Sequence, residues 1–509
     1  MFTVPAAEPG SKSTANRAAG VQPNRASRSR KLRTATTYGV MALALGALVA
    51  GCSSNSAPPA TMATDTSNNV QFTACQPTTC SGTLDGNPYE IVMPTKWNGS
   101  LLIYSQDTPA LSATAAKYKP VAEVAPGWAT QNHAISDLLL AQGYALAGAA
   151  TQSAGWQVNQ QVEAAIKLRE HFASAVGTPN RIYTWGESSG ALASVVLAQN
   201  NDWVNGAAPL CGLLAGINPN YDIALDAAFA VKTLLAPGLK LSDYKSAAEA
   251  NDAYKTATAA VAAAAKDKYG PGGVKLNVIA AVAVVPIKTA TNSGSGMNGS
   301  TVTLSENLMP ILARSTAGRY QIEQQFHGNP STNVGTDYAA RVTPGQTAKL
   351  DIYSKGAMAK YLKVLANAKR VAANATAREA AGASAAISGN VRVPTATLHT
   401  EFDANAIVQN DSAYAAAAIK AGADQTRLLK INVTSPPKSY PDKGAVPYGA
   451  GHCNFTPQSV VGTMAVVNDQ VRDGIYPTAA NTARLMGPES GLDSTYRLQP
   501  WPVGPDNAS

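Results

Sequence analysis

The sequence is poor in histidine and cysteine, and this scarcity limits the chemistry that it can support. The 509 residues include five histidines and five cysteines, scattered along the chain. A zinc site usually needs three or four such side chains at short, regular spacings. We therefore expect no zinc site, and the sequence gives no reason to assign another metal or a cofactor.

The sequence also lacks a basic patch with interleaved aromatic residues, which would indicate a nucleic-acid partner. The formal net charge is +8, but residues 1–51 contain seven Lys or Arg residues and one Glu. Without this segment, 33 basic and 31 acidic residues remain. The basic balance is therefore largely a property of the N-terminus, and we expect no nucleic-acid partner.

The N-terminal segment has no hydrophobic run long enough to span a membrane. Its basic part is followed by an uncharged apolar stretch from about Tyr38 to Ala50, which is the anatomy of a signal peptide. The stretch ends Leu48-Val-Ala-Gly-Cys52 and resembles a bacterial lipobox, which implies that a diacylated Cys52 is the mature N-terminus and anchors the protein in the membrane. The alternative is ordinary cleavage of the signal peptide, in which Cys52 is not lipidated and has no role. We expect an exported protein on the outer face of the cell membrane, or in the periplasm or outer membrane.

Gly186-Glu-Ser-Ser-Gly190 is the one Gly-x-Ser-x-Gly motif in the chain. It follows an apolar, strand-like run at Ile182 and Tyr183 and precedes the helix-like run 191–197. This context is typical of a nucleophile elbow, in which a serine on a strained turn projects its hydroxyl into a cleft. Side chains at the glycine positions would clash with such a turn. The N-terminus of the following helix would stabilise an oxyanion beside Ser188.

The proton-transferring histidine follows by elimination, because the chain order with this elbow is Ser, then Asp or Glu, then His. His133 and His171 precede Ser188, and His327 and His399 precede the best candidate for the acid. His452 remains. It lies in a Gly-rich loop, after the apolar run 428–433 and before a helix that Thr456-Pro457 would open.

The acid should lie just beyond the end of a strand. The run 394–398 is such a strand, and Asp403 lies in the turn after it; Glu401 and Asp411 are weaker candidates. In this interpretation Ser188 attacks a carbonyl carbon, His452 transfers the proton, and Asp403 fixes the imidazole tautomer. The amide N–H of Ser189 should be one oxyanion donor, and the loop after the strand 101–104 should supply the second.

With these residues the sequence resembles the α/β-hydrolase superfamily, from about residue 89 to 216 and from 393 to 473. Two segments are similar to a group of secreted bacterial hydrolases: Trp97-Asn-Gly-Ser-Leu-Leu-Ile-Tyr-Ser105 and Gly143-Tyr-Ala-Leu-Ala-Gly148. The resemblance implies a mostly parallel sheet covered by helices on both faces. That group usually has His-Gly where this chain has Gln106-Asp107. Thr108 then matches the position of the second oxyanion donor, and we expect Asp107 to point away or to bind an alcohol or a cation.

The resemblance, together with the composition of the segments, implies the domain organisation. We expect a signal peptide at 1–51, a flexible tether at 52–69, a hydrolase core at 70–213 and 390–509, and a mainly helical cap at 214–389 that would restrict substrate access. The cap is Ala-rich, with helical runs at 247–266, 306–326 and 357–386 and an apolar run at 274–287 that is interrupted by Lys275 and Asn277. These two residues favour packing over membrane insertion. The segment 291–300 is predicted to be a loop.

Four cysteines remain after Cys52, and four cysteines allow three pairings. Cys75 and Cys80 could close a small loop. Cys211 ends the predicted strand 206–210, and Cys453 adjoins His452, so a bridge between them would hold the histidine loop. Free buried thiols are the alternative, but they are less expected in an oxidising compartment.

These features favour a serine hydrolase that cleaves carboxylic esters outside the cytoplasm, with a small-molecule or lipid ester as substrate and the membrane as a second partner. A serine peptidase of the same fold and a non-catalytic, lipid-anchored binding protein are the alternatives.

Overall fold

The computed structural model describes residues 79–107, 133–151, 155–294, 296–422, 425–438, 440, 448–475 and 477–502, together with the backbone of 71–75. The predicted signal peptide, Cys52, the tether and Thr108 lie outside the described residues.

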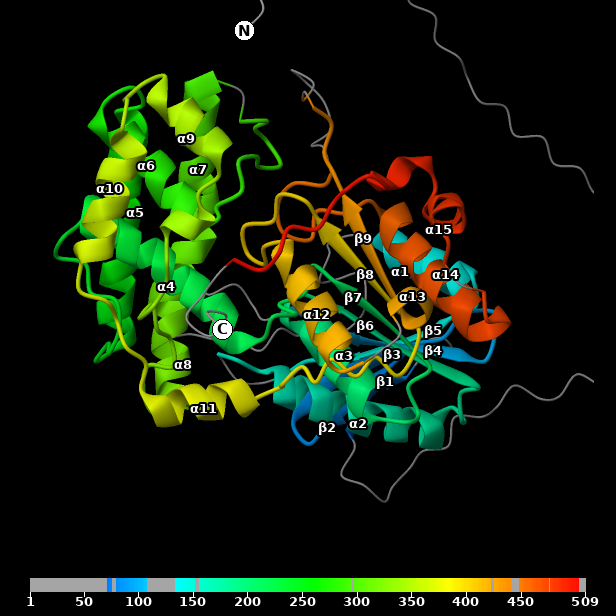
Figure 1. Cartoon of the computed structure of the whole chain (residues 1–509). Helices are drawn as coiled ribbons and strands as arrows, with labels where there is room; N and C mark the ends of the chain where they lie inside the picture. The colour runs from blue at the N-terminus through cyan, green and yellow to red at the C-terminus, as the bar shows by residue number, and fades with distance from the viewer. Residues whose placement is uncertain are drawn as a thin grey trace, which may run out of the picture. The chain divides into compact units, whose positions relative to one another are not determined.

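A single sheet forms the centre of the described part of the chain (Figure 1). Its nine strands have the order β1-β2-β3-β5-β4-β6-β7-β8-β9. The six strands from β5 to β9 in this order are parallel, whereas β1, β2 and β3 are antiparallel to their neighbours. The bounds are β1 Gln71–Cys75, β2 Thr79–Leu84, β3 Asn87–Val92, β4 Ser100–Ser105, β5 Ala145–Ala149, β6 Arg181–Glu187, β7 Gly206–Leu210, β8 Thr395–Thr400 and β9 Leu429–Thr434.

Helices cover both faces of this sheet. Successive side chains of a strand point to opposite sides, so each strand packs against helices on both faces. In β4, Leu101 and Ile103 pack in a cluster with α2, whereas Leu102 and Tyr104 pack in a cluster with α1 and α14. The predicted α/β-hydrolase fold is thereby confirmed. The core helices are α1 His133–Ala141, α2 Val158–Ala175, α3 Ser189–Asn200, α12 Gln409–Lys420, α13 Gln425–Leu428, α14 Pro457–Asp473, α15 Ala479–Met486 and the short 3-10 turn η4 Pro488–Ser490.

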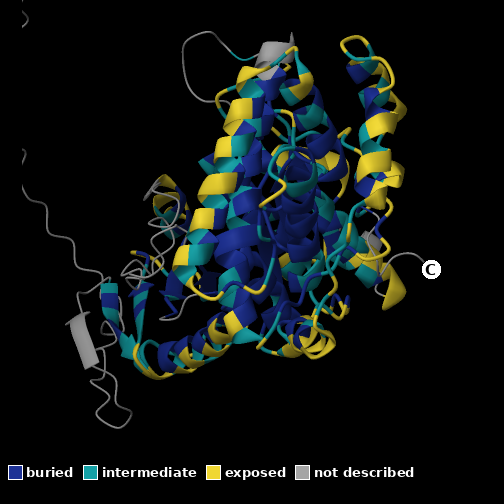
Figure 2. Cartoon of the chain, turned by 90° about the vertical axis from the view of Figure 1, so that its left-hand side faces the viewer, coloured by how far each residue is buried: buried dark blue, intermediate teal, exposed yellow. Residues whose placement is uncertain are grey.

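The chain between β7 and β8, which the sequence predicts to be the cap and which keeps that name here, is helical and has a hydrophobic core of its own. Figure 2 shows buried residues at the centre of these helices and exposed residues on their outer sides. A buried ion pair also lies inside the cap, between Asp226 and Arg341 at 2.7 Å. The elements are α4 Ile217–Leu234, α5 Ala247–Lys266, α6 Pro271–Val282, α7 Gly296–Ala313, the π-helix η2 Arg314–Gly318, α8 Arg319–Gln325, the 3-10 turn η3 Ala339–Arg341, α9 Pro344–Asp351, α10 Ala357–Asn367 and α11 Ala375–Ala383.

Two expectations within the cap are wrong. The run 357–386 is broken between α10 and α11, because Asn329 and Asn333 hydrogen-bond the backbone of residues 371–374 and hold it in a non-helical conformation. The segment 291–300 is only partly a loop, since α7 already begins at Gly296. The apolar run 274–287 is packed: α6 contributes Leu276, Ile279 and other residues to the cap core. Among the described residues, no helix combines the length and the apolar character that crossing a membrane requires.

Candidate active site

Ser188 lies between the end of β6 and the start of α3, in a strained backbone conformation. Its φ is 55° and its ψ is −114°. A serine is held there only when the surrounding structure compensates for the strain, and such strain is concentrated at functional sites. The Ser188 amide donates a hydrogen bond of 3.0 Å to the carbonyl oxygen of Leu210 on β7, which fixes the turn against the sheet.

The glycines of the motif are required by a close approach of two chain segments. A Cβ atom at Gly186 or at Gly190 would overlap the carbonyl oxygen of Ser105 at the end of β4. The predicted steric reason for the glycines is therefore correct, and the clashing partner is the strand that leads to Gln106 and Asp107. Ser189, the expected oxyanion donor, is buried as the first residue of α3.

Asp403 and His452 are in direct contact. Asp403 is fully buried after β8. Its Oδ1 accepts hydrogen bonds from the amides of Asn405 and Ala406, and its Oδ2 accepts a hydrogen bond of 2.8 Å from Nδ1 of His452. This geometry places the proton of the neutral imidazole on Nδ1 and leaves Nε2 as the acceptor. Burial disfavours the Asp403 carboxylate, but His452 and the hydrogen bonds more than offset this and lower its pKa.

Backbone contacts hold these two residues together. The amide of Gly451 donates a hydrogen bond to the carbonyl oxygen of Phe402, and the hydroxyl of Thr400 donates one to the carbonyl oxygen of Gly451. The histidine loop is thereby attached to the acid turn at residues adjacent to Asp403 and His452.

Asp107 points toward His452, so the expectation that it would point away is wrong. One of its carboxylate oxygens lies 3.8 Å from Nε2 of His452, a nitrogen that forms no hydrogen bond within the described part of the chain. Burial lowers the pKa of His452, but the carboxylates of Asp403 and Asp107 outweigh it and raise the pKa to about 10. No hydrogen bond joins the described side chains of Ser188 and His452.

Glu187, which precedes the candidate nucleophile, adds a further acidic group. Its side chain is buried, and burial together with the Asp107 carboxylate raises its pKa to about 7, while His452 opposes the shift. The sequence alone predicts no role for Glu187. The sequence signal that could have identified Glu187 is its position within the motif, because the residue next to Ser188 lies at the same edge of the sheet.

A disulfide joins Cys211 and Cys453, as the sequence analysis favoured, with their Cα atoms 5.4 Å apart. Cys211 follows β7 and its amide donates a hydrogen bond of 2.7 Å to the carbonyl oxygen of Leu398 on β8. Both sulfur atoms lie close to the imidazole of His452, but in a disulfide they are not thiolate ligands for a metal. Cys75 and Cys80 face each other in the β1–β2 pair, and Cys80 is disulfide-bonded.

The alternative acids do not contact His452. Glu401 lies two residues before Asp403. Burial raises its pKa, and Ser435 and Lys288 only partly oppose this rise. Asp411 lies on the first turn of α12, 3.4 Å from Nδ1 of His399. His399 was set aside because it precedes the acid, and its contact with Asp411 and Asp403 was not foreseen. Its place on β8, four residues before Asp403, was the signal that could have found it.

Comparison with known protein families gives one match. Residues 83–342, just over half of the chain, match the Tannase-like family of unknown function (DUF6351). The chain belongs to this family. The matched region includes Ser188 and ends within the cap, before Asp403 and His452.

This chain has no match among the curated proteins. Its structure is similar to an esterase from Aspergillus oryzae, with 12% identity, 78% of this chain and 80% of that chain covered, and a TM-score of 0.36. It is also similar to the rice cell wall degrading esterase LipA from Xanthomonas oryzae, with 12% identity, 78% and 89% covered, and a TM-score of 0.30. A third similarity is to the acylaminoacyl peptidase from Pyrococcus horikoshii, with 7% identity, 79% and 42% covered, and a TM-score of 0.35. Similarities of this size say nothing about the substrate.

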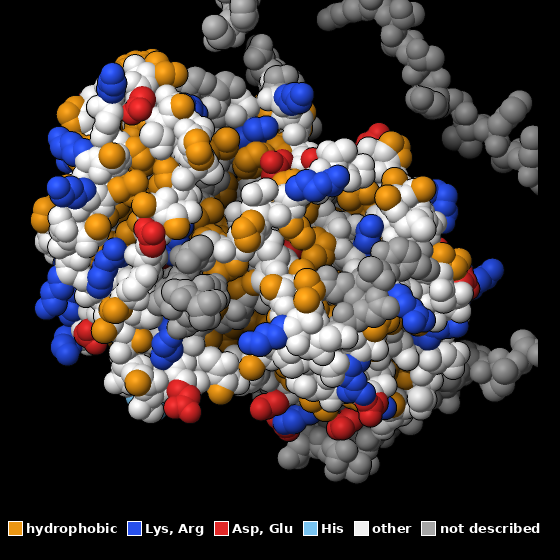
Figure 3. All heavy atoms as spheres, in the orientation of Figure 1, with side chains coloured by type: hydrophobic (Ala, Val, Ile, Leu, Met, Phe, Trp, Pro, Cys, Tyr) orange, Lys and Arg blue, Asp and Glu red, His pale blue; other side chains and the backbone are white. Residues whose placement is uncertain are grey.

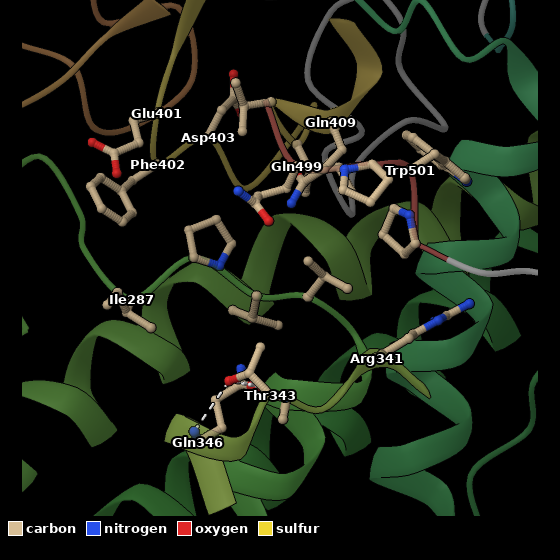
Figure 4. Close-up of a pocket in the computed structure, with 18 of the residues that line it drawn as sticks. Ile287, Arg341, Thr343, Gln346, Glu401, Phe402, Asp403, Gln409, Gln499 and Trp501 are labelled. Atoms are coloured by element: carbon tan, nitrogen blue, oxygen red, sulfur yellow. Dashed lines mark hydrogen bonds between the residues drawn. The ribbon is translucent and has the colours of Figure 1, made fainter. Parts of the chain in front are cut away.

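In this tannase-like chain a cavity of about 400 Å³ lies between the cap and the core, beside the acid turn. Figure 4 shows Glu401, Phe402 and Asp403 on one side of it, Ile287, Thr343 and Gln346 of the cap on the other, and Trp501 of the C-terminal segment beside them. Its lining is mainly apolar, and its polar groups include the amides of Gln346, Gln409 and Gln499 and the charged side chains of Arg341, Glu401 and Asp403. Figure 3 shows hydrophobic side chains gathered along this boundary. The size and lining are typical of a small-molecule site.

Proposed function

We propose that this protein is a serine hydrolase that cleaves carboxylic esters through an acyl-enzyme on Ser188. One observation carries the proposal: a serine at positive φ, with glycines two residues before and after it where a Cβ atom would overlap Ser105, shares a sheet edge with the Asp403–His452 hydrogen bond. Within this fold such a set performs nucleophilic catalysis.

The proposed reaction has two halves. Nε2 of neutral His452 accepts the proton of the Ser188 hydroxyl as Oγ bonds to the carbonyl carbon of the ester. The resulting imidazolium, stabilised by Asp403, then gives this proton to the departing alcohol, which leaves an acyl group on Oγ. Water attacks the acyl-enzyme by the same route, with His452 as its base, and releases the carboxylic acid. We assign the amide of Ser189 as one oxyanion donor and keep Thr108 as the second.

The substrate proposed is a small ester or a lipid ester. The cavity beside Asp403 supports a small substrate by its volume, and neither Ser188 nor His452 is among its lining residues. We further propose that the protein is exported and anchored through lipid on Cys52, which rests on the sequence alone. Substitution Cys52→Ser should abolish incorporation of labelled palmitate, and a soluble wild-type protein that begins at another residue would refute the anchor.

A serine peptidase is the second candidate, and Asp107 is the observation that favours it. Its carboxylate is partly exposed at the site and could bind the α-amino group of a peptide or an aminoacyl substrate. Turnover of aminoacyl or peptidyl nitroanilides above that of p-nitrophenyl esters would establish this alternative.

The deciding experiment compares Ser188→Ala with Ser189→Ala. Ser188→Ala should abolish ester hydrolysis and labelling by a fluorophosphonate, because the attacking oxygen is removed. Ser189→Ala is the matched control, since it removes a neighbouring hydroxyl but keeps the amide that we assign to the oxyanion. Circular dichroism checks that both variants fold. Wild-type protein that neither turns over esters and nitroanilides nor accepts the fluorophosphonate would support the binding-protein alternative.

A further inference from the structure

A second histidine–aspartate pair lies directly behind the candidate acid. His399 on β8 is fully buried, as is Asp411 on the first turn of α12. Nδ1 of His399 is 3.4 Å from a carboxylate oxygen of Asp411, and Nε2 is 3.8 Å from Oδ2 of Asp403. These two carboxylates are the charged groups that face His399 within the described part of the chain, and His399 lies between them.

The hydrogen bonds of His399 determine where its protons must lie. Nε2 is 2.7 Å from the carbonyl oxygen of Ala406, and a carbonyl oxygen can only accept, so Nε2 carries a proton. Nδ1 faces Asp411. If neither partner carried a proton there, two buried acceptors would oppose each other. A proton therefore belongs to Nδ1 or to Asp411.

Two features of the structure stabilise negative charge at the position of Asp411. The carboxylate is on the first turn of α12, where the helix dipole stabilises negative charge. The hydroxyl of Thr397 also donates a hydrogen bond of 3.2 Å to it. The second proton then stays on His399, which is an imidazolium. Burial alone lowers the pKa of His399, but Asp411 and Asp403 more than offset this and raise it.

We infer that His399, held as an imidazolium by Asp411, is a positioning residue that keeps Asp403 ionised and turned toward His452. This inference rests on the proposed function of the site. Through Nε2, His399 fixes the carbonyl of Ala406, whose amide binds Oδ1 of Asp403. Its positive charge lies beside Oδ2, the atom that accepts the hydrogen bond from His452. The charge therefore disfavours a second positive charge on His452.

The test uses His399→Gln, Asp411→Asn and the double variant, with pH profiles of kcat/KM on p-nitrophenyl acetate. Each substitution removes the imidazolium, so the pKa of His452 should rise. The acid limb should move to higher pH by roughly half a unit or more, which is about a threefold loss of activity on that limb. The double variant should move no further than either single variant, because the imidazolium of His399 is lost in all three. KM should stay unchanged.

His171→Gln is the matched control, since His171 is a buried histidine on α2, away from the site. Rates are divided by the fraction of protein that a fluorophosphonate labels, so partial misfolding does not count as a shift. Profiles that superimpose on the wild type would overturn the inference and leave His399 a purely structural residue, whereas wild-type protein without turnover or labelling would refute the proposed function instead.

A second measurement does not depend on activity. Nitrogen NMR of histidine-labelled protein, assigned with His399→Gln, should show both ring nitrogens of His399 protonated at neutral pH and Nδ1 deprotonated in Asp411→Asn. A neutral His399 in the wild type would overturn the inference directly.

Discussion

Replacement of Asp107 by Asn should make the protein more active at neutral pH. Asp107 lies 3.8 Å from Nε2 of His452, the nitrogen that must be free of a proton to act as a base. Its carboxylate stabilises the imidazolium and contributes to the raised pKa of His452. In Asp107→Asn the pKa of His452 should fall, so a larger fraction of His452 is neutral at any pH on the acid limb.

The size of the shift follows from the distance. Two unit charges 3.8 Å apart interact by about 1 kcal/mol in bulk water and by about 4 kcal/mol at an effective dielectric constant of about 20. The Asp107 side chain is 39% exposed, so solvent screening places the interaction near the lower value, roughly 1–2 kcal/mol. This corresponds to a fall in the pKa of His452 of about one unit.

The assay is the pH profile of kcat/KM on p-nitrophenyl acetate between pH 5 and 10, with Asp202→Asn as the control for loss of a surface carboxylate. With a His452 pKa of about 10 in the wild type, this range lies on the acid limb, and the limb of Asp107→Asn should lie about one unit lower in pH. High salt should reduce the difference because Asp107 is partly exposed. An acid limb that is unchanged, or displaced to higher pH, would refute the electrostatic reading of this contact.

Three further predictions concern the site. Asp403→Asn should lower kcat by about 10³–10⁴-fold and His452→Ala by at least as much, whereas Glu401→Gln should be nearly neutral; a damaging Glu401→Gln with a harmless Asp403→Asn would reassign the acid. The Cys211→Ser/Cys453→Ser double variant should lose about 2–4 kcal/mol of unfolding free energy and turn over more slowly, as measured by denaturant melts and kinetics, and alkylation of Cys453 in the native wild type would contradict the bond. Trp501→Ala should raise KM for bulky aryl esters and leave p-nitrophenyl acetate unaffected; equal effects on both substrates would remove the cavity from the substrate-binding site.

The elements that the sequence predicts well are those in which burial is a local property of the chain. The predicted strand 206–210 coincides with β7 and the predicted helix 247–266 with α5. The central strands are apolar because both faces of a covered parallel sheet are buried. The hairpin turn between β2 and β3 is also determined locally, because Asp85 and Gly86 have φ values of 49° and 82°, and Asp-Gly is a preferred pair for a tight turn with two left-handed residues.

The features that the sequence missed depend on contacts between distant segments. The direction of Asp107 is set by how the chain leaves β4, and no property of a single aspartate encodes it. The break between α10 and α11 arises from asparagines about forty residues earlier. The contact of His399 with Asp411 needs α12 to return to the end of β8. Each of these is a polar interaction, which follows no hydrophobic periodicity.

The candidate residues also come from segments that the sheet joins, and this explains how they can share one edge. Ser188, Asp403 and His452 follow β6, β8 and β9, and in a parallel sheet the carboxyl ends of the strands meet at the same edge. His452 lies well beyond the end of its strand, β9, so the strand alone does not fix its position. Cys211 supplies a further attachment, because its backbone is hydrogen-bonded to β8 and its sulfur is bonded to Cys453, the residue after His452. The disulfide therefore acts on the orientation of the base as well as on stability, and its loss should cost turnover even where the protein remains folded.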